Sequence, residues 1–386
     1  MTGSRDFKRL VRKRMAETGE SYTVARSHFE APTRKPSSKK NSSARLTGAA
    51  FKKEIYGRRR TNEIAAHLEK HYGIDCSKAT KLDVGVYRID RGPDPSWVAR
   101  IFPAARSIDS VHGDAEILDY LERQGFPAER LAHPAPVSLL AGQPVLVTEY
   151  SDGSSRRSDA TEETLGTLGT LLGRLNSMSD GPDACMRSAG SWHHLSVNGG
   201  GRRGDVDRLT ALFDDARTRL SRDELPLLKG LRDELGALDD CDDLPKAFVH
   251  PDPCGANLLA WTGDDGVLVD WTGAGNGPRL LALTNLIGSV TSLAMVDAAV
   301  QGFRQYSTLT KKEIGRLEHA LVGFPLILDC WMVLFKGQSL EELMKRLPVH
   351  RQRAQAIAGR ARSAFAATLS QPATPEPDER QSSLFD

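Results

Sequence analysis

Apolar residues recur along this chain with two different periods. Between residues 79 and 150 they form short runs separated by Gly, Pro and charged residues, a pattern typical of β-strands. In later parts of the chain leucines recur three and four residues apart, which places them on one face of an α-helix. The pattern therefore predicts a β-rich first part and a helical second part, in which these leucines pack in the core. The expected helices cover residues 161–178, 205–220, 224–238 and a set from Leu280 to about Phe365.

The β-rich part is expected to contain several strands and one helix. Residues 79–90 form a strand-rich run with a single glycine, Gly85, and residues 97–102 and 144–150 predict two further strands. Residues 108–125 have apolar side chains at helical spacing, so we expect a helix there. Its apolar positions are Val111, Ala115, Leu118 and Leu121.

A polar loop in the second half carries closely spaced functional groups. His250, Asp252 and Asn257 lie between two short apolar runs, and a tight turn (TGDDG, residues 262–266) follows. The next apolar run leads to Asp270 and reads as a returning strand. A hairpin of this kind would hold Asp270 beside the loop.

These residue types suit phosphoryl transfer from a nucleotide. Carboxylate and amide oxygens are the ligands that Mg²⁺ prefers, so Asp270 and Asn257 are candidate metal ligands. Asp252 can accept the proton of an attacking hydroxyl or orient that hydroxyl. We expect His250 to brace the loop through hydrogen bonds to the backbone. The alternative is a β-hairpin in which the acidic residues only form turns.

The order of these residues also resembles a known family. The loop reads H-P-D-x-x-x-x-N-L-L and is followed by V-D-W-x-G-A-G-x-G-P, which departs from the H-R-D and D-F-G of protein kinases. This version resembles the aminoglycoside phosphotransferase family. The resemblance implies an α+β, two-lobed protein-kinase-like fold, with a nucleotide-binding lobe at 49–150 and a catalytic and substrate-binding lobe at 151–369. It also implies ATP or GTP as phosphate donor, Mg²⁺, and a small-molecule hydroxyl as acceptor, such as an aminoglycoside-like antibiotic or an amino alcohol.

The resemblance further implies which residues bind the nucleotide. Arg100 occupies the position of the phosphate-binding lysine of kinases, and Glu116 on the following helix is its expected ion-pair partner. The alternative for Glu116 is an ordinary surface residue. Gly85 would lie in the loop over the phosphates, or would only form a bulge. The backbone near Glu149 and Tyr150 would hydrogen-bond to the base.

One residue of the family pattern is missing. Members of the family have an Asp a few residues after the Gly-Pro pair, where it braces the catalytic region, and this chain has Ala282 at that spacing. No expected ligand is lost with it, so we expect the site to be competent. The acceptor pocket should lie between the helices and Asp252, with the Gly-rich residues 191–205 as a flap or a surface loop. Candidate acidic lining residues are Asp297, Asp329, Glu341 and Glu342.

The two ends of the chain differ from its middle. The net charge of the 386 residues is +2, but residues 1–60 hold 17 Lys or Arg and 5 Asp or Glu, a net +12, which leaves −10 for the rest. Residues 1–30 predict a basic helical segment, 31–48 a flexible linker, and 370–386 a disordered tail. The tail ends in QSSLF, which resembles short clamp-binding peptides of bacterial DNA-metabolism proteins, or is only a loose hydrophobic end.

The basic segment leaves a second function open. It could bind nucleic acid or a protein partner through residues 1–48, or pack as a solvated helix pair on the enzyme. In the first case the chain could be a non-catalytic, nucleotide-binding regulator with a kinase-like fold. Such a regulator would bind ATP without turnover.

Composition favours a cytoplasmic enzyme. The chain is 39% hydrophobic and 26% charged, and it has no uninterrupted apolar run near the roughly 20 residues of a membrane helix, so no membrane partner is expected. The N-terminus lacks the apolar core of a secretory signal. The five cysteines are scattered without a C-x-x-C motif, which argues against disulfides and structural zinc.

Overall fold

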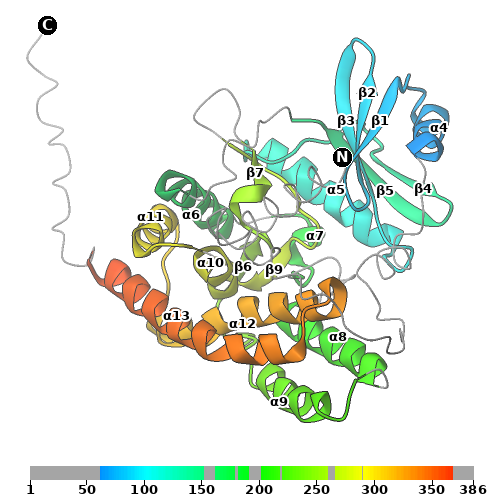
Figure 1. Ribbon diagram of the computed structural model, residues 1–386. Coiled ribbons are helices and arrows are strands. Elements are labelled where there is room, and N and C mark those ends of the chain that lie inside the picture. The colour runs from blue at the N-terminus through cyan, green and yellow to red at the C-terminus, as the bar shows by residue number, and fades with distance from the viewer. Residues whose placement is uncertain are drawn as a thin grey trace, which may run out of the picture.

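The computed structural model describes residues 61–151, 161–178, 181–190, 201–217, 220–259, 266–288 and 290–367. The segments predicted at 1–48 and 370–386, most of the turn at 262–266 and most of the Gly-rich stretch at 191–205 lie outside these residues. Within them, the chain forms a small lobe built on a sheet and a larger lobe of helices (Figure 1). The α+β architecture expected from the sequence is confirmed.

The small lobe contains a five-stranded antiparallel sheet in the order β1-β2-β3-β5-β4. Successive side chains of β3 point to opposite faces of the sheet. Trp97, Ala99 and Ile101 are buried in the core of this lobe, whereas Arg100, between them in sequence, points to the opposite face of the sheet. The strands are β1 (Lys78–Asp83), β2 (Val86–Arg91), β3 (Asp94–Ile101), β4 (Val137–Leu140) and β5 (Gln143–Glu149).

Two helices complete the small lobe. Helix α4 (Thr61–Tyr72) buries Ile64 and Leu68 in the same apolar cluster as the inward residues of β3. Helix α5 (Ile108–Arg123) begins after Ser107, whose hydroxyl oxygen accepts a hydrogen bond from the amide of Ser110, and this N-cap matches the helix predicted from apolar spacing. Figure 1 shows α5 between the sheet and the larger lobe.

The larger lobe is mainly helical, as the leucine spacing predicts. Its N-terminal helices are followed by short strands and then by four further helices that pack on one another. The helices are α6 (Glu162–Ser177), α7 (Asp183–Met186), α8 (Gly201–Ala216), α9 (Glu224–Gly236), α10 (Arg279–Gly288), α11 (Leu293–Arg304), α12 (Lys311–Lys336) and α13 (Leu340–Ala367).

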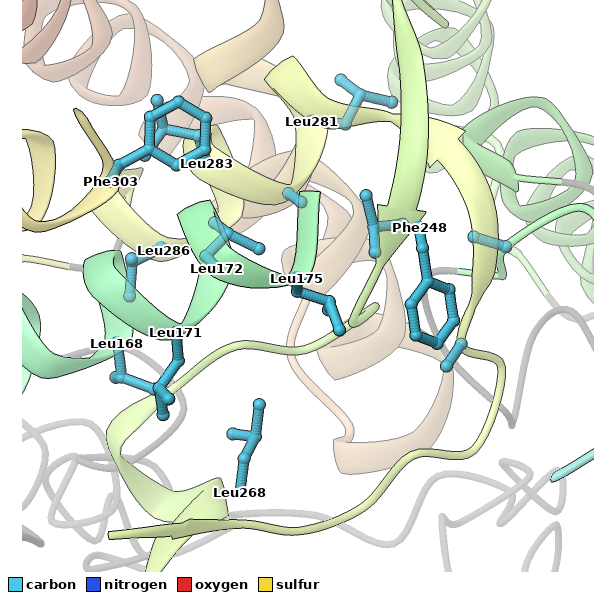
Figure 2. Packing of buried hydrophobic residues seen from close by; sticks show 14 of the residues in the cluster. Leu168, Leu171, Leu172, Leu175, Phe248, Leu268, Leu281, Leu283, Leu286 and Phe303 are labelled. Atoms are coloured by element: carbon cyan, nitrogen blue, oxygen red, sulfur yellow. The ribbon is translucent and has the colours of Figure 1, made fainter. Parts of the chain in front are cut away.

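The periodic leucines form the core of this lobe, as predicted. Four leucines of α6 share one apolar cluster with residues of α10 and α11 and with Phe248, which precedes the expected catalytic loop, residues 250–257. In Figure 2 Leu175 points to the side of Phe248, whereas Leu168 and Leu171 point to the side of Leu268. Each fully buried leucine contributes roughly 1.5–3 kcal/mol relative to an exposed one. The catalytic loop therefore begins from the centre of the apolar core. The α6 leucines are Leu168, Leu171, Leu172 and Leu175.

Helices α6 and α11 approach each other so closely that their backbones touch. A Cβ atom added to Gly169 or Gly173 would overlap the carbonyl oxygen of Ala299 or Phe303, and one added to Gly302 would overlap that of Gly166. Glycine removes the side chain that would hold the helices apart, although it costs up to about 1 kcal/mol in helix propensity relative to alanine. This contact fixes α11 against the helix that supports the catalytic loop.

Two short sheets hold the segment that contains the expected catalytic loop and Asp270. Strand β6 (Lys246–Val249) pairs with β9 (Gly275–Pro278), and β7 (Leu258–Leu259) pairs with β8 (Val267–Leu268). The β7–β8 pair is the hairpin expected from the sequence, with shorter strands than predicted. The 3₁₀ helix η2 (Gly255–Asn257) fills part of the loop between β6 and β7.

Helix α12 has a capped N-terminus and is largely apolar along its length. Thr310 and Glu313 form a reciprocal capping box, and Glu313 is also held by two hydrogen bonds of 2.8 Å from Arg279 at the start of α10. Residues 311–334 are the one stretch in the described part of the chain that is long and apolar enough to cross a membrane. Of its most apolar window 67% is buried inside the fold, as in a core helix of a globular domain.

Candidate active site

His250 is a buried brace for the loop that carries Asp252. Its Nδ1 accepts a hydrogen bond of 3.1 Å from the amide of Asp252, so its Nε2 carries the proton and donates to the carbonyl oxygen of Val269 at 3.2 Å. The ring also stands edge-on to Trp271, with 4.8 Å between centroids. The imidazole thus ties the loop to the strand that leads to Asp270, and its contacts agree with the bracing expected from the sequence.

Burial lowers the pKa of His250 to about 4, because the charged ring would lose its hydration. The ring is therefore neutral near pH 7. The unfolded chain, with a His pKa of 6.5, binds the proton first as the pH falls. The stability that the neutral ring contributes is present above pH 6.5 and is lost as the pH falls toward 4.

We expect the free energy of unfolding to fall by about 2 kcal/mol between pH 7 and pH 5 through His250 alone. His250→Asn removes the titrating group but keeps an acceptor for the Asp252 amide. Urea unfolding at both pH values should show a smaller pH-dependent loss in His250→Asn than in the unmodified chain. An equal loss in both proteins would contradict the prediction.

Asp252 and Asn257 are joined directly across the loop. The Nδ2 of Asn257 donates to the backbone oxygen of Asp252 at 2.9 Å and to its carboxylate Oδ2 at 3.1 Å. With its amide nitrogen so engaged, Asn257 has its amide oxygen to offer to a cation. The structure thus brings together the expected base and one of the two expected metal ligands.

Asp270 lies next to this pair. The amide of Val269 donates to the backbone oxygen of Asn257 at 2.8 Å, which continues the β7–β8 ladder by one bond. Asp270 then turns into the left-handed region, with φ of 69°. Only a few non-glycine residues, Asn and Asp above all, adopt this conformation readily. The second expected metal ligand is therefore placed by a sharp turn at the end of the hairpin.

Arg100 does not pair with Glu116 as the sequence suggested. The guanidinium of Arg100 forms an ion pair with the carboxylate of Asp270 and lies 4.0 Å from the carboxylate of Glu129. Glu116 is exposed on α5, since the helix buries the face that carries Val111 and Leu118. The alternative reading of Glu116 as a surface residue fits the structure.

Gly85 sits in the tight turn between β1 and β2. Its φ of 71° lies in the region that glycine adopts without steric cost, and its carbonyl oxygen accepts from the amide of Ile101 at 2.7 Å. The turn connects β1 directly to β2, and β2 pairs with β3, the strand that carries Arg100. The loop over the expected phosphate position is thus a two-residue turn, Val84 and Gly85.

The stretch that should meet the base has its amide groups already engaged. The amide of Glu149 donates to the carbonyl oxygen of Arg130 at 2.8 Å, and that of Tyr150 donates to Ser96 at 2.9 Å. Neither N–H group is available to a base in this conformation. The ring of Tyr150 instead stacks against the guanidinium of Arg88, 4.2 Å from the ring centroid.

The sequence did not predict the contacts of Glu129 and Arg187. Glu129 lies between α5 and β4, far from Asp270 in sequence. The one available signal is that it is the single acidic residue between Glu122 and Glu149. Arg187, after α7, binds the carboxylate of Asp114 on α5 and donates to the carbonyl oxygen of Ala274 at 2.9 Å. A buried acidic residue on the apolar face of α5 was the available signal for this contact.

Helix α10 reaches the catalytic loop without the expected Asp. Ala282 is buried and supplies no polar contact, but Asn285, almost one turn later, donates from Nδ2 to the carbonyl oxygen of Pro251 at 3.4 Å. This long hydrogen bond joins α10 to the residue before Asp252. A polar brace from α10 is therefore retained in a different position.

A cavity of about 50 Å³ lies beside the catalytic loop, between α10 and α12. His250 and Pro251 form one wall, and Arg202 at the start of α8 forms another. The four acidic residues suggested from the sequence as pocket residues do not line it; Asp329, for example, is held by Arg346 at 3.0 Å and by His350 at 2.8 Å. The acidic residues that line the cavity are Asp240 and Asp242.

Comparison with solved structures agrees with this architecture. An amicoumacin kinase in complex with AMP-PNP, Ca²⁺ and Ami superposes with a TM-score of 0.53 at 15% identity, covering 75% of this chain and 92% of that chain. The choline kinase LicA from Streptococcus pneumoniae gives 0.51 at 11% identity, covering 77% and 98%. A microcompartment-associated aminopropanol kinase gives 0.50 at 18% identity, covering 78% and 98%. At these identities the likeness shows the fold.

The sequence itself identifies the family. No curated protein matches the chain. A model of the phosphotransferase enzyme family, in contrast, matches residues 82–312, which include β3, α5, the catalytic loop and Asp270. The expectation of a phosphotransferase with a kinase-like fold is confirmed, and the chain belongs to the phosphotransferase enzyme family.

Proposed function

We propose that this chain transfers the γ-phosphate of ATP to a hydroxyl group of a small molecule. The observation that supports this most directly is the hydrogen-bonded pair of Asp252 and Asn257, held beside Asp270. The three residues come from one loop and the hairpin that follows it, in the order expected for a phosphoryl-transfer site. The reaction depends mainly on alignment and on neutralisation of charge.

Asp252 is the proposed base. Its carboxylate is partly exposed and has one oxygen held by Asn257 at 3.1 Å, which fixes its orientation. An acceptor hydroxyl beside this carboxylate could pass its proton to Asp252 while its oxygen attacks the γ-phosphorus; the bond from the γ-phosphorus to the bridging oxygen then breaks and ADP leaves. The neutral His250 does not compete for that proton near pH 7, since both ring nitrogens are bonded to the backbone.

Asn257 and Asp270 are the proposed metal ligands. Mg²⁺ takes oxygen ligands and fills its remaining positions with water and phosphate oxygens, so two protein ligands suit it. In the described part of the chain no group of three or more His, Cys, Asp or Glu is arranged to hold a metal ion, so the donor set of Asn257 and Asp270 suits a nucleotide-bound Mg²⁺ better than a metal held by protein alone. When bound, Mg²⁺ would neutralise phosphate charge.

Arg100 is the proposed phosphate clamp. In the present conformation its guanidinium is paired with Asp270, so a metal at Asp270 and a phosphate at Arg100 would together replace that ion pair. A guanidinium can bind two phosphate oxygens at once. The exchange keeps charges of opposite sign in contact before and after nucleotide binding.

The test is nucleotide turnover across a panel of acceptors. Purified protein with Mg²⁺ and either ATP or GTP is mixed with aminoglycosides, macrolides, amino alcohols or sugars. Each amine is also tested in its N-acetylated, uncharged form, because Asp240 and Asp242 line the cavity and would attract a positively charged amine. We expect acceptor-dependent release of ADP or GDP that EDTA abolishes, and a phosphate ester on the acceptor by ³¹P NMR. Nucleotide binding without turnover on any acceptor would contradict the proposal and favour a non-catalytic regulator.

A further inference from the structure

Glu129 is a buried carboxylate at the junction of the two lobes. It lies in the segment between α5 and β4, and only 8% of its side chain is exposed. Its own amide donates to the carbonyl oxygen of Leu268 at 3.1 Å, so the segment is fixed to the end of β8. A buried carboxylate is costly unless charged or hydrogen-bonding partners surround it. Two of the groups around Glu129, the guanidinium of Arg100 and the amide of Asp270, belong to residues of the proposed nucleotide site.

Three elements meet at this carboxylate. Its Oε2 accepts from the hydroxyl of Thr148 on β5 at 3.1 Å, and its Oε1 accepts from the backbone amide of Asp270 at 3.0 Å. The same Oε1 lies 4.0 Å from Nη2 of Arg100 on β3. The carboxylate therefore has its position fixed from β5 and from the hairpin while it faces the guanidinium.

The charges explain why this position matters. Arg100 lies between two carboxylates, those of Asp270 and Glu129, and Asp270 is also a proposed metal ligand. A cation bound at Asp270 competes with Arg100 for the same oxygens. In that case the charge of Glu129 would still attract Arg100, and its hydrogen bond from the Asp270 amide would keep the left-handed turn in place.

We propose that Glu129 is a positioning residue for nucleotide binding, and that it does for Arg100 what the sequence assigned to Glu116. It holds the guanidinium beside the phosphates once Mg²⁺ occupies Asp270, and it orients Asp270 through the backbone. Glu129 touches neither nucleotide nor acceptor in this account. The inference rests on the proposed Mg²⁺-nucleotide site. It predicts that Glu129 strengthens binding of the nucleotide with Mg²⁺ and has little effect on binding of the nucleotide without metal.

Binding of AMP-PNP, measured by calorimetry with Mg²⁺ and again with EDTA, tests this without any acceptor. In Glu129→Gln the charge is lost while an oxygen remains for the Asp270 amide. Arg100 then no longer faces the charge of Glu129. We expect the affinity in Mg²⁺ to fall about tenfold, as for loss of a charge-assisted contact, and the affinity in EDTA to change less than about twofold. Glu116→Gln, an exposed carboxylate on α5, is the matched control and should bind like the unmodified protein in both conditions.

The Mg²⁺-to-EDTA ratio separates positioning from loss of structure. Glu129→Asp keeps the charge and should recover part of the ratio, and thermal unfolding shows that each variant is folded. Parallel losses in both conditions, no change in Glu129→Gln, or a loss in Glu116→Gln instead would overturn the inference and leave the proposed function standing. Absence of AMP-PNP binding by the unmodified protein would overturn the nucleotide site and the inference together.

Discussion

Replacing Asp252 by Asn is expected to lower kcat about a thousandfold with little change in nucleotide affinity. Asn has almost the same shape and can still accept the hydrogen bond from Asn257, which measures 3.1 Å to Asp252 Oδ2. It cannot accept a proton from the acceptor hydroxyl. General-base catalysis contributes about 10²–10⁴ in rate, so its loss should fall in this range. Steady-state turnover with the best acceptor, together with AMP-PNP binding, measures both quantities.

The matched control is Asp119→Asn. Asp119 is an exposed carboxylate on α5 whose partner is Arg123 at 2.9 Å, one turn along the same helix. This change also removes one negative charge, but we expect kcat to stay within about twofold, since surface ion pairs contribute little. If Asp252→Asn retained more than a tenth of the activity, the base would have to be another group.

The second large effect is expected in stability, at the contact of α6 with α11. Gly169→Ala places a methyl group against the carbonyl oxygen of Ala299, and a backbone oxygen cannot move aside as a side chain can. Overpacking typically costs 1–3 kcal/mol, and the gain in helix propensity returns at most about 1 kcal/mol. We expect the free energy of unfolding to fall by about 2 kcal/mol, measured by urea denaturation.

Gly166→Ala on the same helix provides the comparison. A Cβ atom there would lie 3.8 Å from the carbonyl oxygen of Ala298, which is ordinary contact. The propensity gain should then dominate and raise stability by up to about 1 kcal/mol. Equal effects of the two substitutions would mean that the helices can separate at no cost, against the packing described above.

The local parts of the site could be predicted from the sequence. His250, Asp252 and Asn257 lie within eight positions of one another, and the turn signal before Val267 places Asp270 beside them. Strand and helix periods were equally readable, because the buried residues of β3 and α6 repeat every two residues or every three to four. The spacing of buried residues within a strand or a helix follows from backbone stereochemistry, so it can be recognised in the sequence.

Contacts between distant segments were not readable in this way. Glu129 meets the amide of a residue 141 positions later, and nothing in its neighbourhood marks that partner. The expected pairing of Arg100 with Glu116 was wrong for a reason that the sequence contains. Ala115 and Leu118 lie on the buried face of α5, and Glu116 lies about 100° around the helix from Ala115. The prediction followed the family resemblance, whereas the helical spacing of the apolar residues already placed Glu116 away from the buried face of α5.

The left-handed backbone of Asp270 bears on how such an enzyme could lose its activity. At φ of 69° the position accepts Asp, Asn or Gly more readily than other residues. Asn and Gly are each a single nucleotide change away from Asp in the genetic code; Asn offers only a neutral amide oxygen, and Gly has no side chain. A descendant could therefore lose the carboxylate that we propose as a metal ligand in one mutational step while keeping the turn, so the shape of this site can outlast its chemistry in evolution.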